Sequence, residues 1–282
     1  MAESASSARA PLVTVIGPPS GWVSFNAAEL WAYRELLYFF VWRDIKVRYK
    51  QTVIGAGWAV IQPFFTMVVF TLFFGLLARI PSDGLPYPVF YFAALLPWIY
   101  FANALAAATG SVVDHQRMIT RVYFPRVLLP MAAVTSGLLD FGIGLAFLFG
   151  MMAWFGVWPS LGGVFLPLFL LLAMATALAA SLWLSALNAL YRDVRYVMPF
   201  LIQFWMFASP VAYPSSLVPE RWRWLYALNP MAGVIEGFRW SLTGQGQPPG
   251  MHLAVSAAAV LVTLLGGWAY FQRMEGTIAD VV

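Results

Sequence analysis

The chain has 282 residues, of which 61% are hydrophobic and 10% charged, and its formal net charge is +4. Soluble domains average about 25% charged residues, so this composition excludes an ordinary soluble fold and indicates a chain embedded in a bilayer. The sequence contains no cysteine and two histidines, which excludes disulfides and thiolate sites and argues against a histidine metal cluster. We attribute the basic charge to membrane orientation and not to nucleic-acid binding.

The N-terminal part consists of two segments. Residues 1–24 are rich in Ser, Ala, Pro and Gly and lack the apolar core of a signal peptide, so we expect a flexible tail. Residues 25–50 combine aromatic with basic side chains, which predicts an amphipathic helix lying in the membrane interface. Three of its cations are candidate partners of a lipid phosphate, or anchors of the topology alone: Arg43, Arg48 and Lys50.

Residues 51–282 predict an all-α integral membrane domain with six transmembrane helices. A spanning helix needs about 20 apolar residues, because about 30 Å of hydrocarbon is crossed at about 1.5 Å per residue. Stretches of this kind with at most one charged residue are 51–78, 84–113, two within 127–191 that are separated by the run 156–163, 196–219, and one within 240–272 that starts near His252.

The distribution of basic residues predicts the orientation of these spans. Six spans place both termini on one side of the membrane. With that side taken as the cytoplasm, twelve Lys and Arg residues fall inside and four fall outside. Cytoplasmic loops carry the excess of Lys and Arg, so we expect both termini in the cytoplasm.

The connection between the second and third spans, residues 114–126, places basic and aromatic side chains close together. Such a surface suits docking to a soluble partner, and a solvated loop that follows the charge rule would have the same composition. The candidate docking residues are Arg117, Arg121, Tyr123, Phe124, Pro125 and Arg126.

One charged residue, Asp140, falls inside a predicted span. An ionisable group in a span is costly, and a proton relay usually needs a chain of such groups. We therefore expect a structural role for Asp140, by pairing across helices or by lying near a span end. Counting about 1.5 Å per residue from Arg126 places it roughly 21 Å along, toward the outer half of the membrane.

Residues 217–242, on the outer side, are too charged to span the membrane and yet rich in aromatic side chains. We predict two short helices broken at Asn229–Pro230 that lie at the outer interface or dip into it as re-entrant helices. Irregular backbone at membrane depth must be buried in protein or face a water-filled cavity, so this segment is a candidate gate. Its candidate residues are Trp222, Trp224, Asn229, Pro230 and Arg239.

Catalytic and nucleotide-binding motifs are missing from the sequence. A phosphate-binding loop needs a lysine that follows glycine, and neither lysine, Lys46 or Lys50, does so. The sequence contains neither Gly-x-Ser-x-Gly nor His-Glu-x-x-His. We therefore expect no catalytic residue, metal or cofactor in this chain.

Several motifs resemble, in order, those of the permease subunits of type-2 ABC exporters, the family that exports O-antigen, capsule and teichoic acid. The resemblance runs from about residue 27 to 270. Its motifs are Val41–Thr52, Leu96-Pro97-Trp98, Arg121–Arg126, Tyr191–Arg195, Ser209-Pro210 and Asn229-Pro230-Met231.

The resemblance implies a homodimer of permeases with two cytoplasmic ATP-binding-cassette subunits in the bacterial inner membrane, with ATP and Mg bound by the partner chains. It implies that residues 25–50 are an interface helix, that 114–126 contain the coupling helix, and that 217–242 form paired outer gate helices. The expected cargo is a polysaccharide carried on an undecaprenyl-type lipid through phosphate or pyrophosphate, as in O-antigen export.

A sugar polymer needs a wide path with flat apolar surfaces, and aromatic side chains in or near the first, second and fifth spans could supply them. The alternative for each is contact with lipid or with a neighbouring helix. The candidate path residues are Phe64, Phe65, Trp98, Tyr100, Phe101, Phe204 and Trp205.

Two other functions stay open at this point. A type-2 ABC permease for another lipid or a drug would share the topology but would not depend on polymer synthesis. A membrane glycosyltransferase or polymerase is disfavoured, because the outer loops show no paired carboxylates. A secondary transporter is also disfavoured, because the sequence shows no internal repeat.

Overall fold

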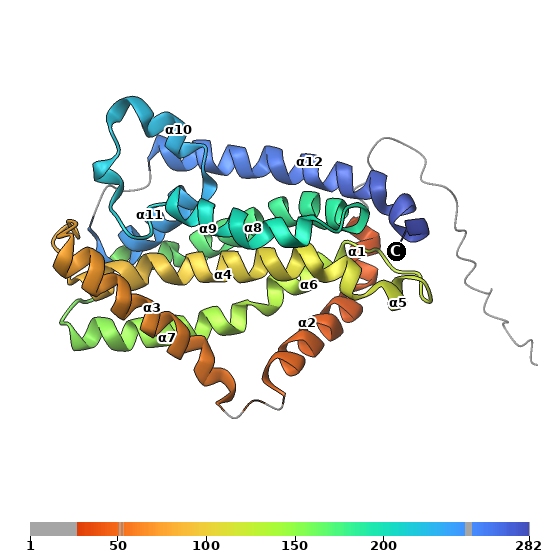
Figure 1. The fold of residues 1–282 in the computed structure, drawn as a ribbon, viewed down its shortest axis with the longest axis horizontal. Coiled ribbons are helices and arrows are strands. Elements are labelled where there is room, and N and C mark those ends of the chain that lie inside the picture. The colour runs from red at the N-terminus through yellow and green to blue at the C-terminus, as the bar shows by residue number, and fades with distance from the viewer. Residues whose placement is uncertain (1–26, 51, 53, 246–249, 282) are drawn as a thin grey trace, which may run out of the picture.

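The computed structural model describes residues 27–50, 52, 54–245 and 250–281, and every regular element within them is helical. The tail expected over residues 1–24 lies outside these ranges. Figure 1 shows an elongated bundle in which the long helices run side by side, with α4 (Tyr87–Asp114) along its middle. The described part of the chain is therefore the all-helical protein that composition predicts.

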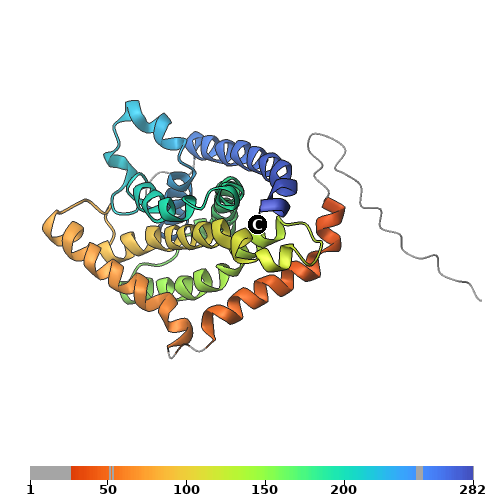
Figure 2. The ribbon, with the colours of Figure 1, turned by 45° about the vertical axis from the view of Figure 1, so that its right-hand side comes forward.

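The N-terminal helices lie on the outside of this bundle. After the short α1 (Ala27–Ala32), α2 (Arg34–Tyr49) runs obliquely along the outside of the bundle (Figures 1 and 2). Phe40 is buried against the bundle, whereas Phe39 and Trp42 are exposed. Apolar side chains thus occupy more than one face of α2, so its amphipathic character is less pronounced than its composition suggests.

Five helices within the described ranges are long and apolar enough to cross a membrane. They correspond to the first four and the last of the six predicted spans, and the predicted break at 156–163 separates the third from the fourth. These helices are Gly55–Leu77, which contains α3 (Trp58–Phe70); α4; Leu128–Trp154, which contains α6 (Leu128–Ser136) and α7 (Leu138–Trp154); Leu161–Leu190, which contains α8 (Leu166–Leu190); and Met251–Thr277 in α12 (Met251–Val281).

The predicted fifth span, 196–219, is not one long helix. Its helical part, α9 (Val194–Phe207), has 14 residues, about 21 Å at about 1.5 Å per residue, which is less than the roughly 30 Å of hydrocarbon. The helix ends there because Pro210 and Pro214 follow, and a proline disfavours helical geometry in the residue before it. The described chain thus contains five candidate spans and one shorter apolar helix.

The third span bends between α6 and α7, at Gly137. The Tyr100 hydroxyl of α4 donates a hydrogen bond to the Val134 carbonyl, 3.0 Å away. A Cβ added at Gly137 would lie 3.2 Å from the Tyr100 ring, so the ring would have to shift by a few tenths of an ångström to admit a side chain there. A side chain inserted beside a helix in this way is a known cause of bending.

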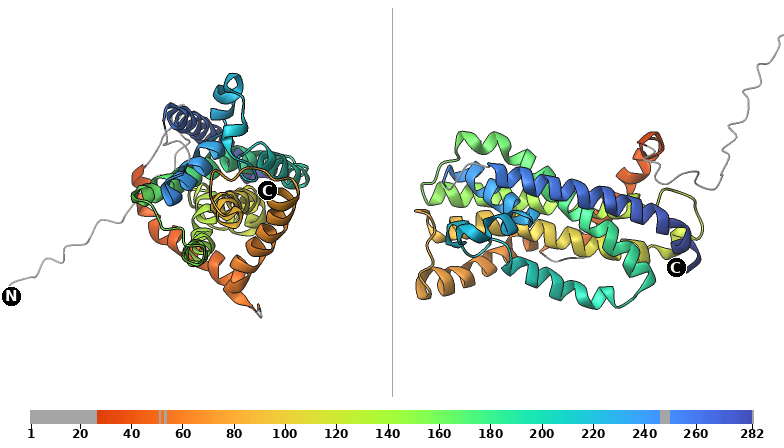
Figure 3. Two further views of the ribbon diagram at one scale, coloured as in Figure 1. Left: turned by 90° about the vertical axis from the view of Figure 1, so that its left-hand side faces the viewer. Right: turned by 90° about the horizontal axis from the view of Figure 1, so that it is seen from above.

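Burial differs sharply between α4 and α3. The left view of Figure 3 looks along the bundle and shows α4 inside it. Almost every residue from Val89 to Phe101 is buried. α3 lies on the outside, and Phe65, Phe73 and Leu77 in its span are well exposed. An exposed apolar face of this kind is available to lipid or to another helix.

The short elements gather at the two ends of the bundle. One end carries α5 (Gln116–Ile119) together with α1 and the C-terminal part of α12 (Figure 1). The opposite end carries α10 (Arg223–Ala227) and α11 (Pro230–Thr243), and the break at Asn229–Pro230 between them is where the sequence predicts it. The candidate docking and gate residues therefore lie at opposite ends.

Candidate functional site

The connection 114–126 has an exposed side and a buried side. Asp114 is the last residue of α4, helix α5 covers four further residues, and the remainder is turn and irregular chain. Arg117, Arg121 and Tyr123 are exposed. Phe124 is only 3% exposed and packs edge-on against Phe40 of α2, with ring centroids 5.6 Å apart. The predicted docking set is thus divided between a free surface and an internal anchor.

Arg126 forms a second anchor, toward α12. Its backbone N–H donates to the Glu275 carboxylate, 3.0 Å away, and its guanidinium donates to the Glu275 carbonyl. Pro125, between the two anchors, is half-buried. The connection is therefore fixed to the N-terminal helix on one side and to the last helix on the other.

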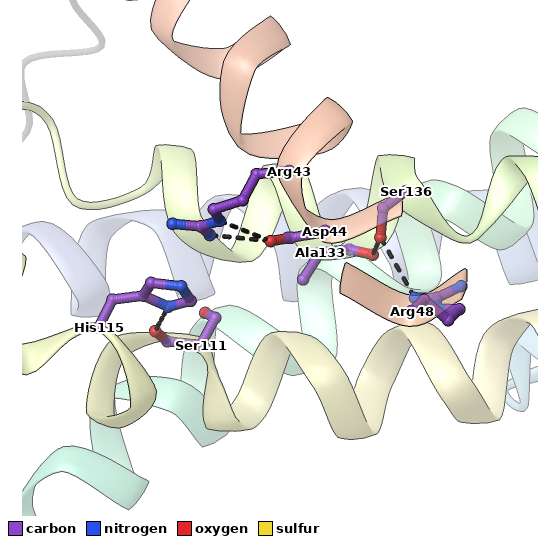
Figure 4. A network of polar contacts seen from close by, with 7 residues as sticks. All are labelled: Arg43, Asp44, Arg48, Ser111, His115, Ala133 and Ser136. Carbon is purple, nitrogen blue, oxygen red and sulfur yellow. Dashed lines mark hydrogen bonds and ion pairs between the residues drawn. The ribbon is translucent and has the colours of Figure 1, made fainter. Parts of the chain in front are cut away.

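The cations of α2 differ in their partners. Arg43 pairs with Asp44 at 2.8 Å and lies over the Phe40 ring. Arg48 forms an ion pair with Asp140, in the first turn of α7, and lies 3.4 Å from the Ser136 hydroxyl. Figure 4 shows both the Arg43–Asp44 pair and the contact of Arg48 with Ser136.

The pairing of Asp140 with Arg48 is the cross-helix contact that the sequence offered as one role for this carboxylate. A negative charge near a helix N-terminus is also favourable in itself. Figure 4 further shows His115 against the Ser111 carbonyl, at 2.7 Å, where α4 ends. Lys50 is exposed, as is Arg48, but unlike Arg43 and Arg48 it forms no ion pair among the described residues.

The candidate path residues fall into two groups. Trp98, Tyr100 and Phe101 are at most 4% exposed and belong to the packed core. Phe65 and Phe204 are each more than 60% exposed, and Phe64 is 38% exposed. Trp205 is partly buried and stacks edge-on against Phe101, with centroids 4.9 Å apart. Exposed aromatic surface therefore comes from α3 and α9.

Sequence reasoning overlooked two members of the α9 surface. Tyr196 and Phe200 are 82% and 70% exposed and precede Phe204 at intervals of four, so the three rings share one face of the helix. The rings of Phe200 and Phe204 are stacked, with centroids 6.5 Å apart. The four-residue spacing in the sequence was the signal that could have identified this stripe.

A cavity of about 710 Å³ lies between α4 and the start of α9. Its lining includes Asn103, Asp114 and Asn188, and the basic pair Arg192 and Arg195. The Asn188 side chain donates to the Thr109 carbonyl at 3.1 Å and so fixes α8 to α4 beside the cavity. The aromatic stripe of α9 begins at this cavity, since Tyr196 also lines it.

Asn229 connects the candidate gate to α9. Its amide oxygen accepts from the Met231 N–H, as a helix N-cap, and from the Trp205 indole at 2.8 Å. Its amide nitrogen donates to the Ala208 carbonyl and to the Ser209 hydroxyl. One side chain thus caps the start of α11 and satisfies the irregular backbone after α9, and Pro230 occupies the first position of α11.

Arg239 is held inside the bundle at the far end of α11. It is 6% exposed, donates to the Pro210 carbonyl at 2.9 Å, and its guanidinium lies 3.8 Å from the centre of the Phe90 ring. Burial lowers the pKa of Arg239 to about 10, which leaves it charged at neutral pH. Trp222 and Trp224, by contrast, are exposed.

The chain matches known proteins over most of its length. The family model described as ABC-2 type transporter matches residues 35–243. The O-antigen export system permease protein RfbA of Myxococcus xanthus is 31% identical over 258 residues, which cover 90% of this chain and 98% of that protein.

More distant relatives carry similar names. A protein of the same name from Klebsiella pneumoniae is 25% identical, over 88% of this chain and 95% of its own length. The polysialic acid transport protein KpsM of Escherichia coli is 24% identical, over 83% of this chain and 91% of its own length. With the family match extending from α2 to the end of α11, the chain belongs to the ABC-2 type transporter family.

Proposed function

We propose that this chain is the membrane subunit of an ATP-driven exporter that moves a lipid-linked, O-antigen-like polysaccharide across the bacterial inner membrane. Two copies would work with two separate ATP-binding-cassette subunits, which bind ATP and Mg, and both termini would lie in the cytoplasm. The relatives named for O-antigen export and polysialic acid transport support the choice of a polysaccharide cargo.

The main support for this proposal is the structure of the connection 114–126, which has one exposed face and one face packed against the helices. An element that transmits force from a soluble ATPase needs a free face for docking and a fixed face toward the transmembrane helices. Arg121 and Tyr123 supply the free face. Phe124 and Arg126 fix the other face to α2 and α12. Movement of the docked partner would therefore act on the first and last helices together.

The exposed aromatic surfaces of α3 and α9 support a path formed between two copies. A single copy leaves these surfaces uncovered, since Phe65 and Phe204 are 62% and 64% exposed. Flat aromatic faces suit the CH faces of sugars, and Asn103, Asn188 and the two arginines in the cavity at the start of this stripe could bind sugar hydroxyls. We propose that the exposed members of the predicted path set line the path and that the buried members support them.

The outer end would close the path when no cargo passes. We propose that α10 and α11 act as the gate, with Asn229 holding the start of α11 against α9. Among the three interface cations, Lys50 is the best placed to meet a lipid phosphate, because Arg43 and Arg48 already pair with carboxylates.

Purification of the tagged protein from its native membranes tests the proposal. A stoichiometric ATP-binding-cassette subunit should copurify with the unaltered chain, and Arg121→Ala should weaken this association and reduce export. Arg221→Ala removes an exposed arginine at the opposite end and should leave the association unchanged. Absence of such a partner from an intact dimer, or continued transport in cells that make no polysaccharide, would reject the exporter assignment.

A further inference from the structure

The cavity of about 710 Å³ between α4 and α9 contains two arginines that have no carboxylate partner. Arg192 and Arg195 both line it and both are exposed, and neither forms an ion pair among the residues that the structure describes. Asp114 is the one carboxylate in the described lining, since Asp193 lies outside it. The cavity therefore carries an excess of positive charge, which favours an anionic ligand.

The charged residues lie at one end of the cavity, where helices begin and end. Arg192 falls between the end of α8 at Leu190 and the start of α9 at Val194, and Asp114 is the last residue of α4. A Cβ added at Gly110 would lie 3.0 Å from the Oδ2 atom of Asp114, so this carboxylate is folded back over its own helix. The arginines thus stand at the level of the span ends, where lipid headgroups lie and where basic pockets between helices bind them.

Away from these charges, most of the lining consists of small and apolar side chains. Ala102, Ala106 and Gly110 follow one another on α4 at intervals of four, so they share one face of that helix. Pro199 and Ile202 contribute from α9. Such a lining fits an amphiphilic ligand, with its charged group at the arginines and its less polar part between the two helices.

One polar side chain, Asn103, lies deeper in the lining. It precedes Asp114 by 11 positions, about 17 Å at about 1.5 Å per residue, which is close to half of the roughly 30 Å of hydrocarbon. Asn103 is exposed, although almost every residue from Val89 to Phe101 is buried. Lipid offers an amide no hydrogen bonds, so a polar side chain at this depth indicates polar contents of the cavity beside it.

A phosphate group matches the two arginines better than a sugar hydroxyl does. A guanidinium group stays charged and presents its N–H donors in a planar fork. A hydroxyl can accept one of these hydrogen bonds but leaves the charge unbalanced, whereas phosphate oxygens balance the charge and accept in bidentate pairs. Arg192 and Arg195 are three positions apart and line the same cavity, so one pyrophosphate group can contact both.

We infer that Arg192 and Arg195 bind the phosphate or pyrophosphate group through which the cargo is attached to its lipid, at the entrance to the path. The inference rests on the proposed function and deepens it by assigning the residues that receive the cargo. Tyr196 lines the same cavity and begins the stripe that continues with Phe200 and Phe204. A glycan held by its phosphate at this point would therefore have its first sugars beside the first aromatic ring of the path.

Native mass spectrometry of the detergent-solubilised complex, the permease with its copurified ATPase, tests this site. Undecaprenyl pyrophosphate without glycan is the probe, and phosphatidylglycerol is the competing anionic lipid. Arg192→Gln and Arg195→Gln should each lower the affinity for the probe about tenfold, because a hydrogen bond between charged groups is lost. Arg273→Gln, at an exposed arginine of α12 outside the cavity, is the matched control and should leave the affinity unchanged.

Asp114→Asn should shift the affinity in the opposite direction. It removes the carboxylate from the described lining and with it a like charge near the phosphate, so binding of the probe should strengthen roughly twofold. A purely structural role of the two arginines would not produce opposite shifts from changes of opposite charge. Equal weakening by Asp114→Asn and the arginine variants would therefore contradict the inference.

The copurified ATPase shows whether each variant still folds and assembles. Unchanged affinity for the probe in both arginine variants would overturn the site. Displacement of the probe by an equal amount of phosphatidylglycerol would also overturn it, by showing a site for bulk lipid, as would failure of the unaltered complex to bind the probe. In these three cases the ATPase in the complex would still support the proposed function. Absence of the ATPase from the unaltered protein would overturn the proposed function and the inference together.

Discussion

The ring of Phe124 packs edge-on against Phe40, with centroids 5.6 Å apart, and joins the connection after α4 to the N-terminal helix α2. The next residue but one, Arg126, joins the same connection to α12. Three parts of the chain that are far apart in sequence are thereby held at one end of the bundle. Changes at this point are expected to affect transmission of force and stability in separable ways.

Phe124→Ala should destabilise the protein, because removal of a buried Phe side chain typically costs about 3–5 kcal/mol. Phe40→Ala should have a similar effect, and the double variant should be less destabilised than the sum, by about 0.5–1.5 kcal/mol for the aromatic pair. Thermal unfolding in detergent measures all three. Tyr123→Ala, at the exposed neighbour, is the control and should change partner binding but not the unfolding midpoint. Strict additivity would show that the ring contact contributes no coupling.

Asn229→Ala should loosen the start of α11. The change removes a helix N-cap, worth about 1 kcal/mol, and leaves the Trp205 indole without its acceptor. Because the chain has no native cysteine, a single Ala232→Cys reporter can follow this loosening. Ala232 is 2% exposed, so the reporter should react slowly with a membrane-impermeant maleimide and faster once Asn229→Ala is added.

Asn229→Asp is the matched control for the gate. It keeps the oxygen that accepts from Met231 and Trp205 and loses the amide donors to Ala208 and Ser209. Its reporter should react at an intermediate rate. If the reporter reacted at the same rate with Asn, Ala or Asp at position 229, Asn229 would not be the residue that holds the start of α11 against α9.

Asp140→Asn should alter lipid binding more than stability. The Arg48–Asp140 pair is partly exposed, and such pairs contribute at most about 1 kcal/mol. Loss of the carboxylate charge should free Arg48 for an anionic headgroup and raise the amount of anionic lipid that copurifies, as measured by native mass spectrometry. Lys50→Gln, a change at an exposed cation that we propose contacts lipid phosphate, should lower it. An unchanged lipid profile in Asp140→Asn would show that the ion pair does not control Arg48.

Phe200→Ala and Phe204→Ala should reduce export without a matching loss of stability. Both rings are exposed, so their truncation leaves the packed core intact, whereas the proposed path loses two flat surfaces. Leu171→Ala, at a side chain of α8 that is 61% exposed, is the control. Surface polysaccharide per inserted permease is the measurement. Equal export from all three variants would remove the α9 stripe from the path.

The spans and the position of the gate break were accessible from sequence for simple reasons. Uncharged length alone identifies a span, whichever way its side chains face, and this is why Tyr87–Asp114 and its neighbours were found. Asn229 followed by Pro230 identifies a helix start locally, because Asn caps and Pro fits the first turn. The early end of α9 was not predicted, because the apolar composition of residues 196–219 outweighed Pro210 and Pro214, which follow the helix.

The sequence did not show in the same way which side chains of a span face the core and which are exposed. Trp98 and Phe65 are both aromatic residues in strongly apolar stretches, yet Trp98 lies in the core and Phe65 is exposed. Nothing local distinguishes them, since both lie in helices that are apolar all round. The Arg48–Asp140 pair joins residues 92 positions apart, and only the arrangement of α2 against the bend at Gly137 brings them together. Long-range pairing of this kind is set by tertiary packing.

The contact of Arg126 with Glu275 also has a consequence for biosynthesis, because the two residues are 149 positions apart. At a synthesis rate of about 5–20 residues per second, the ribosome needs about 7–30 s to reach Glu275 after Arg126. During that interval the connection 114–126 can pack against α2 through Phe124, but it cannot yet form its contact with α12. An ATPase that bound the connection 114–126 only after the Arg126–Glu275 contact had formed would therefore assemble with fully synthesised permeases and not with nascent ones.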